Sequence, residues 1–132
     1  MNITSDALLT DLYELTMAQA YLAQGMTDIA VFEFFVRKLP PQRNFFMAAG
    51  LEQVLSYLEA FQFSDADIAW LDQTGGFSPA SLNALRAMRF TGEVHAMPEG
   101  SLFFPHEPIL RITAPLPQAQ LVETRVMNLL NF

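Results

Sequence analysis

The sequence predicts a single domain of the α+β class, and three observations support this fold class. Apolar residues recur at helical spacing up to residue 90, with one strand-like segment at 29–36. Short apolar runs split by proline and glycine follow between residues 93 and 114, as is typical of strands joined by tight turns. The length of 132 residues suits one domain, spanning residues 1–132.

The composition excludes several classes of protein. A content of 52% hydrophobic and 12% aromatic residues excludes disorder for most of the chain. No apolar run approaches the roughly 20 residues of a membrane-spanning helix, and the first residues lack the pattern of a signal peptide. The net charge of −7 argues against a nucleic-acid partner. The absence of cysteine excludes disulfides and thiol chemistry, and we expect a cytoplasmic protein without membrane contact.

The first predicted helix begins near Asp11 and ends before Gly25. Asp11 with Glu14 resembles the acidic form of a capping box, and Gly25 suits the position that follows a helix end. Helical spacing defines a leucine stripe and a stripe beside it: Leu8, Leu12, Leu15 and Leu22 form the first, and Tyr13, Met17 and Ala20 form the second. We expect the leucine stripe to face the core.

A strand is predicted over residues 29–36, which are rich in β-branched and aromatic side chains. Alternation divides the segment into two faces: Ala30, Phe32, Phe34 and Val36 lie on one, and Val31, Glu33, Phe35 and Arg37 lie on the other. Pro40 and Pro41 end the strand.

Local signals define the remaining elements. A helix is predicted over 51–61 from its apolar spacing, a second after the capping residue Ser64 and up to the Gly75-Gly76 pair, and a third after Ser78-Pro79. Strands are predicted near 93–97, 101–104 and 109–114, and a last helix over 118–132. That helix stops on apolar residues, so we expect the natural polypeptide to continue; packing of Phe132 on a second copy is the alternative.

Self-sufficient catalytic motifs are absent from the sequence, which has no P-loop, G-x-G-x-x-G, H-E-x-x-H or G-x-S-x-G. Basic residues gather at Arg37, Lys38 and Arg43, either by chance in a solvated loop or as an anion site. His95 and His106, with glutamates nearby, leave a small metal-binding β-domain open as a weaker alternative.

Tyr13 and Asp11 each have two interpretations. Tyr13 is either a buried helix aromatic whose hydroxyl finds a backbone acceptor, or a ring that stacks on a flat heteroaromatic ligand. Asp11 is either a helix cap or a ligand contact.

Several segments, in order along the chain, resemble the N-terminal part of nicotinate phosphoribosyltransferases. They are Leu-Leu-Thr-Asp-Leu-Tyr-Glu-Leu-Thr-Met (8–17), Ala-Val-Phe-Glu-Phe-Phe-Val-Arg-Lys-Leu-Pro (30–40), Ala-Ala-Gly-Leu-Glu (48–52), Phe-Thr-Gly-Glu-Val-His-Ala-Met-Pro-Glu-Gly (90–100), Phe-Pro-His-Glu-Pro-Ile-Leu-Arg-Ile (104–112) and Gln-Leu-Val-Glu-Thr-Arg-Val-Met-Asn-Leu-Leu-Asn-Phe (120–132).

The resemblance implies the open-faced, sandwich-like N-terminal α/β domain of a type II phosphoribosyltransferase, with the catalytic α/β barrel absent from this chain. The full-length enzyme would form nicotinate mononucleotide and pyrophosphate from nicotinate and phosphoribosyl pyrophosphate, in NAD salvage. Mg²⁺ and ATP hydrolysis, through a histidine outside this chain, would assist. The enzyme would be a homodimer. We expect the fragment alone to be inactive, to hold no catalytic residue and to bind no cofactor or metal.

For individual residues, the resemblance implies that the Tyr13 ring stacks on nicotinate in the site of the partner subunit, with Asp11 as a weaker ligand contact. It places Arg37 and Lys38 near the phosphoribosyl pyrophosphate pocket. Residues 39–44 depart from the glycine-rich loop of many relatives, which leaves the role of Arg43 open. The main alternative is a stand-alone dimerisation or interaction module without catalytic activity.

Overall fold

The computed structural model describes residues 6–130, and this part of the chain forms five helices and five strands. In chain order they are α1 (Leu12–Ala23), β1 (Ile29–Phe34), β2 (Phe46–Met47), α2 (Leu51–Glu59), α3 (Asp65–Thr74), α4 (Pro79–Ala87), β3 (Glu93–Ala96), β4 (Leu102–Phe103), β5 (Leu110–Pro115) and α5 (Leu116–Leu130). Among these residues no helix combines the length and the apolar character needed to cross a membrane.

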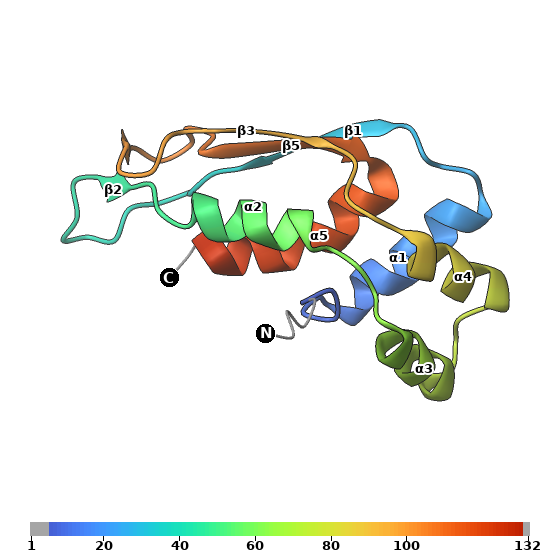
Figure 1. The fold of residues 1–132 in the computed structure, drawn as a ribbon. Helices are drawn as coiled ribbons and strands as arrows, with labels where there is room; N and C mark the ends of the chain where they lie inside the picture. Colours follow the sequence, from blue (N-terminus) through green and yellow to red (C-terminus); the bar gives the residue numbers. More distant parts are fainter. Residues whose placement is uncertain (1–5, 131–132) are drawn as a thin grey trace.

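A three-stranded antiparallel sheet forms one layer of the domain, in the order β1-β5-β3. Helices α5 and α2 lie together beneath one face of this sheet, and α1, α3 and α4 lie to one side (Figure 1). Strands β2 and β4 pair in a small antiparallel ribbon, and β2 lies beyond the N-terminal end of α2. The structure is therefore an open-faced sandwich, as the family resemblance implies, and it belongs to the α+β class that the sequence predicts.

The two faces of the sheet differ in polarity as the alternation predicts. Phe34 of β1 and Ile112 of β5 point inward and are buried. On the outer face the cross-strand partners Glu33 and Arg111 form an exposed ion pair at 2.9 Å. Such a pair contributes at most about 1 kcal/mol, so burial of the inner face holds the sheet in place.

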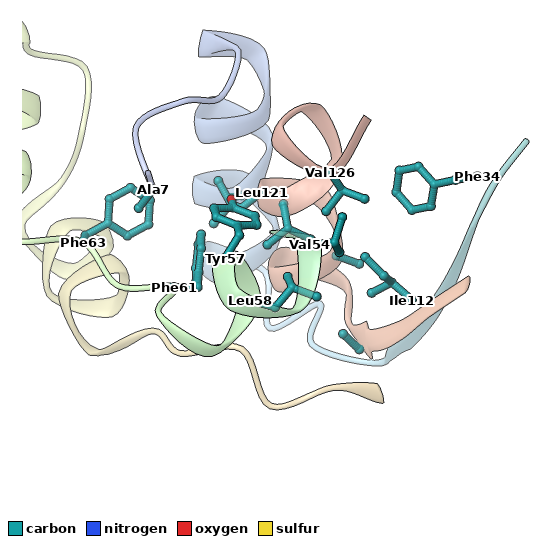
Figure 2. Packing of buried hydrophobic residues seen from close by; sticks show 14 of the residues in the cluster. Ala7, Phe34, Val54, Tyr57, Leu58, Phe61, Phe63, Ile112, Leu121 and Val126 are labelled. Carbon is teal, nitrogen blue, oxygen red and sulfur yellow. The ribbon is translucent and has the colours of Figure 1, made fainter. Parts of the chain in front are cut away.

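Helix α5 is the centre of the hydrophobic core. It packs against α1, α2, β1 and β5. Its Leu121, Val122 and Val126 are fully buried. Figure 2 shows Val126 on the side of Phe34, while Tyr57 of α2 lies beside Leu121. A single buried leucine or valine contributes about 1.5–3 kcal/mol, so this helix supplies a large share of the stability.

Most elements begin and end where the local signals predict. Ser64 forms a capping box with Asp67 at the start of α3, and Ser78 caps α4 ahead of Pro79. Gly25 follows α1 with a positive φ of 66°. Helix α5 begins at Leu116 rather than at residue 118, and residues 131–132 of its predicted range lie outside the described residues.

The orientation of α1 differs from the predicted one. Leu12, expected in the core, is 63% exposed, whereas Glu14, Leu15 and Ala18 are buried. The helix is rotated because its contact with α5 lies along the side that carries Glu14. As a result, the predicted second stripe, with Tyr13 and Met17, and part of the first both face outward.

Helix α2 starts in close contact with the end of α5. Its N-cap, Gly50, has a φ of 98°, and a Cβ at this position would meet the main-chain carbonyl oxygen of Leu129. The carboxylate of Glu99 accepts hydrogen bonds at 3.2 Å from the main-chain N–H groups of Gly50 and Glu52. These contacts satisfy N–H groups that every helix leaves unpaired at its first turn.

We predict that Gly50→Ala destabilises the domain more than Gly25→Ala. Both glycines have positive φ, so each alanine costs about 1–2 kcal/mol for the left-handed backbone. Only Gly50 adds a collision with main-chain atoms, which we expect to raise the loss to about 3 kcal/mol or more. Urea unfolding measures both free energies, and equal losses would contradict the close packing of α2 on α5.

Candidate functional site

The first turn of α1 and the facing side of α5 bring together a cluster of acidic and hydroxyl side chains. Asp11 is the N-cap of α1, but its side chain makes no capping hydrogen bond. Its Oδ2 instead accepts a hydrogen bond at 3.0 Å from the hydroxyl of Thr124 on α5. The predicted capping box of Asp11 and Glu14 is therefore wrong, because both carboxylates turn toward α5.

Glu14 is fully buried. Its Oε1 accepts a hydrogen bond from the Thr124 hydroxyl at 2.6 Å, and its Oε2 accepts one from the Thr10 hydroxyl. Within residues 6–130 neither Lys nor Arg forms an ion pair with Glu14. A buried carboxylate is costly unless hydrogen bonds replace its water, so these hydroxyls are needed to keep α1 on α5.

Tyr13 lies on the outer side of this cluster with its side chain 49% exposed. Its hydroxyl is 3.5 Å from Oε1 of Glu14, at the limit of a hydrogen bond, so the interpretation as a buried ring with a backbone acceptor is wrong. Partial burial and the neighbouring carboxylates of Glu123, Glu14 and Asp11 raise the pKa of Tyr13 above its usual value of 10. The phenol therefore stays protonated at neutral pH.

Exposed apolar side chains lie near Tyr13 in the sequence, Leu9 just before α1 and Leu12 and Met17 within it. Leu9, Leu12 and Met17 are all exposed and, with Tyr13, form what we call the α1 apolar patch. A run of exposed large apolar residues with an aromatic among them is typical of a surface that another molecule covers. The patch thus offers a flat ring face beside apolar contacts.

Arg37 lines a groove between β1 and α5. This groove has a volume of about 550 Å³ and is lined by Val31, Phe32, Glu33, Phe34, Phe35, Val36, Arg37, Ile109, Glu123, Met127 and Leu130. Glu123 belongs to the groove and also acts electrostatically on Tyr13, so it lies between the two predicted site regions. Strand β1 is an edge strand of its sheet, which leaves one side of the groove open.

Lys38 is exposed and does not line this groove. No hydrogen bond or ion pair among residues 6–130 joins Arg37 or Lys38 to Asp11 or Tyr13. The structure brings Tyr13 and Asp11 together and leaves the two basic residues apart from them. Arg43 is exposed in the loop that follows β1.

The metal-binding alternative finds no support in the described residues. His95 lies on β3 opposite Arg111, and the His106 ring lies 6.1 Å from that of Phe35. No three or more His, Asp and Glu side chains between residues 6 and 130 group in a way that can hold a metal ion.

Sequence reasoning missed Glu14, Thr124 and Glu123 as parts of the site. Glu14 stood in a position that suits a capping residue, and α5 was interpreted only from its apolar side. The sequence gives little signal for Glu123 and Thr124, because they lie between the apolar Val122 and Val126, where an amphipathic helix ordinarily carries polar residues.

The chain is similar to known proteins over almost all of its length. Residues 8–131 match the family model described as the nicotinate phosphoribosyltransferase N-terminal domain. A nicotinate phosphoribosyltransferase of Mycobacterium tuberculosis is 55% identical over 122 residues, which are 92% of this chain and 26% of the relative. One of Bacillus subtilis is 42% identical over 127 residues, 96% of this chain and 26% of the relative.

A solved structure has the same fold. The crystal structure of human nicotinic acid phosphoribosyltransferase aligns with a TM-score of 0.84 and 41% identity, over 92% of this chain and 25% of that one. The fold is thus that of a phosphoribosyltransferase N-terminal domain. The chain belongs to the nicotinate phosphoribosyltransferase family, and it spans about a quarter of the length of the curated relatives that it matches.

The environment of Glu123 predicts a pH-dependent stability effect. Partial burial and the nearby Glu14 raise the pKa of Glu123 above its usual value of 4.5. The hydrogen bond that Gln120 donates to Glu123 lowers this pKa in part, and Asp11 raises it further. The folded state therefore favours the protonated carboxyl of Glu123. Protonated Glu123 contributes to the stability of the wild-type domain at low pH, and this contribution is lost as pH rises through the pKa of Glu123 in the folded state.

We expect Glu123→Gln to raise the midpoint of thermal unfolding at pH 7, and this gain to shrink as pH falls toward 4.5. Calorimetry at several pH values measures the difference, with Glu59→Gln at an exposed position of α2 as the control. A gain that stays constant with pH would contradict the raised pKa.

Proposed function

We propose that this chain serves as the N-terminal domain of an enzyme that forms nicotinate mononucleotide and pyrophosphate from nicotinate and phosphoribosyl pyrophosphate, within NAD biosynthesis. The match of residues 8–131 to the family domain is the observation that supports this most strongly. In the proposed reaction the ring nitrogen of nicotinate bonds to the anomeric carbon. The bond from that carbon to pyrophosphate breaks, and pyrophosphate leaves with the electron pair.

The part of the enzyme that performs this step is proposed to lie outside this chain. A barrel that binds phosphoribosyl pyrophosphate would occupy the length that relatives have and this chain does not span. Within residues 6–130 the acidic and histidine side chains form no metal-binding group, so the residues present do not fit Mg²⁺. Coupling to ATP hydrolysis belongs to the same proposal, as does a cytoplasmic homodimer.

Tyr13 is the residue of this chain that we propose to contact nicotinate. Its half-exposed ring lies within the α1 apolar patch and offers a stacking face, while its neutral hydroxyl adds no charge beside the substrate carboxylate. The ring would close the site of the partner subunit and exclude water from a charge-separated transition state. Asp11, Arg37 and Lys38 are proposed as further substrate contacts, with the two cations near phosphate groups.

A second candidate function is a stand-alone dimerisation module, favoured by the same exposed patch on α1. One experiment distinguishes the two candidate functions. The protein encoded by the whole natural reading frame is supplied with nicotinate and phosphoribosyl pyrophosphate, and the formation of nicotinate mononucleotide is measured. Turnover supports the enzyme. A dimer without any turnover supports the module instead.

In the full-length enzyme we predict that Tyr13→Ala raises the KM for nicotinate at least about tenfold, a loss of about 1.4 kcal/mol. Tyr13→Phe retains the ring, so we expect its KM to stay within about threefold of the wild type. The KM for phosphoribosyl pyrophosphate should change little in either variant.

Leu12→Ala is the control for this experiment, because Leu12 is exposed on the same turn of α1 and has no ring. An unchanged nicotinate KM in Tyr13→Ala, with turnover retained, would rule out the stacking role. Equal effects of the Tyr13 and Leu12 variants would indicate a general apolar contact.

A further inference from the structure

Thr124 is the one α5 residue that connects, through its hydroxyl, to both carboxylates of the first turn of α1 within residues 6–130. The hydroxyl oxygen lies 3.0 Å from Oδ2 of Asp11 and 2.6 Å from Oε1 of Glu14. These two acids lie on either side of Tyr13 in the sequence, Asp11 as the N-cap of α1 and Glu14 in its first turn. The hydroxyl carries a single proton, so it donates to one oxygen at a time, and the shorter distance favours Glu14. This contact holds the first turn of α1 at a defined position on α5.

The same contact controls the surroundings of the Tyr13 hydroxyl. Oε1 of Glu14 has two hydroxyls near it, the closer from Thr124 and the more distant, at 3.5 Å, from Tyr13. Glu14 is fully buried, so its oxygen requires a donor. Without the Thr124 hydroxyl, that requirement would fall on Tyr13 and would draw its phenol inward, away from the exposed position of the ring.

We propose that Thr124 is a positioning residue for Tyr13: by donating its hydroxyl proton to the Glu14 carboxylate, it keeps the Tyr13 ring exposed and directed outward. The role of this ring toward nicotinate rests on the proposed function, whereas its orientation does not. Thr124 thus acts on the substrate only through another residue.

The test compares Thr124→Val, which keeps the shape and removes the hydroxyl, with Thr124→Ser, which keeps the hydroxyl. In the full-length enzyme we expect Thr124→Val to raise the KM for nicotinate by about tenfold, with the KM for phosphoribosyl pyrophosphate within about twofold of the wild type. Thr124→Ser should restore the nicotinate KM to within about threefold. In a Tyr13→Ala background, Thr124→Val should add no further increase, because the two residues act as one unit.

Nitration of tyrosine by tetranitromethane, located by mass spectrometry, measures the orientation of Tyr13 without any assay of activity. We expect Thr124→Val to slow nitration of Tyr13 by about threefold or more, because the phenol moves against Glu14. Thr74→Val is the matched control, since the Thr74 hydroxyl donates at 2.8 Å to the main-chain carbonyl of Trp70 within α3 rather than to a carboxylate of α1.

The outcomes separate this proposal from the proposed function. Wild-type full-length protein without turnover contradicts the proposed function, and the nitration rate still decides whether Thr124 positions Tyr13. Unchanged nitration and unchanged nicotinate KM in Thr124→Val overturn the positioning role. If Thr124→Val does not fold, Thr124→Ala replaces it in both measurements, and failure of both variants to fold overturns the proposal in favour of a purely structural role.

Discussion

Burial of α5 beneath the antiparallel sheet is the interaction on which the rest of the structure depends. This helix contacts α1, α2, β1 and β5, so the two layers of the sandwich share one apolar surface. Its end also approaches Gly50 so closely that only glycine fits at the start of α2. Removal of this helix would expose the inner face of the sheet and would leave α1 without its packing partner.

The contact between α1 and α5 differs from the remainder of the core because it contains a buried carboxylate. Glu14 is surrounded by hydroxyl groups rather than by a cation, and the nearby Tyr57 hydroxyl is buried without a hydrogen-bond partner within residues 6–130. Burial, together with the charges of Glu14 and Asp6, raises the pKa of Tyr57 despite an opposing effect of Arg125. This polar interior fixes α1 in one orientation, since any rotation would leave Glu14 without its donors.

That orientation explains why the candidate site lies where it does. With Glu14 turned inward, Tyr13 and its apolar neighbours turn outward, although leucine spacing predicts a different buried side. The polar contact beneath the helix and the apolar patch above it are therefore two sides of one arrangement. Arg37 belongs to a separate groove, which Glu123 connects to the surroundings of Tyr13.

Apart from the short strand β2, the sequence by itself determined the type and order of the elements, because caps, glycines and apolar spacing act within a few residues. Ser64 and Gly25 are examples, and so is the inward and outward alternation along β1. Only the tertiary structure decided which side of α1 is buried and that β1 pairs with β5. Both outcomes depend on partners distant in the chain: Thr124 is 110 residues from Glu14, and Arg111 is 78 residues from Glu33. Periodicity defines the faces of a helix, but the energy of contact with another element selects the face that leaves water.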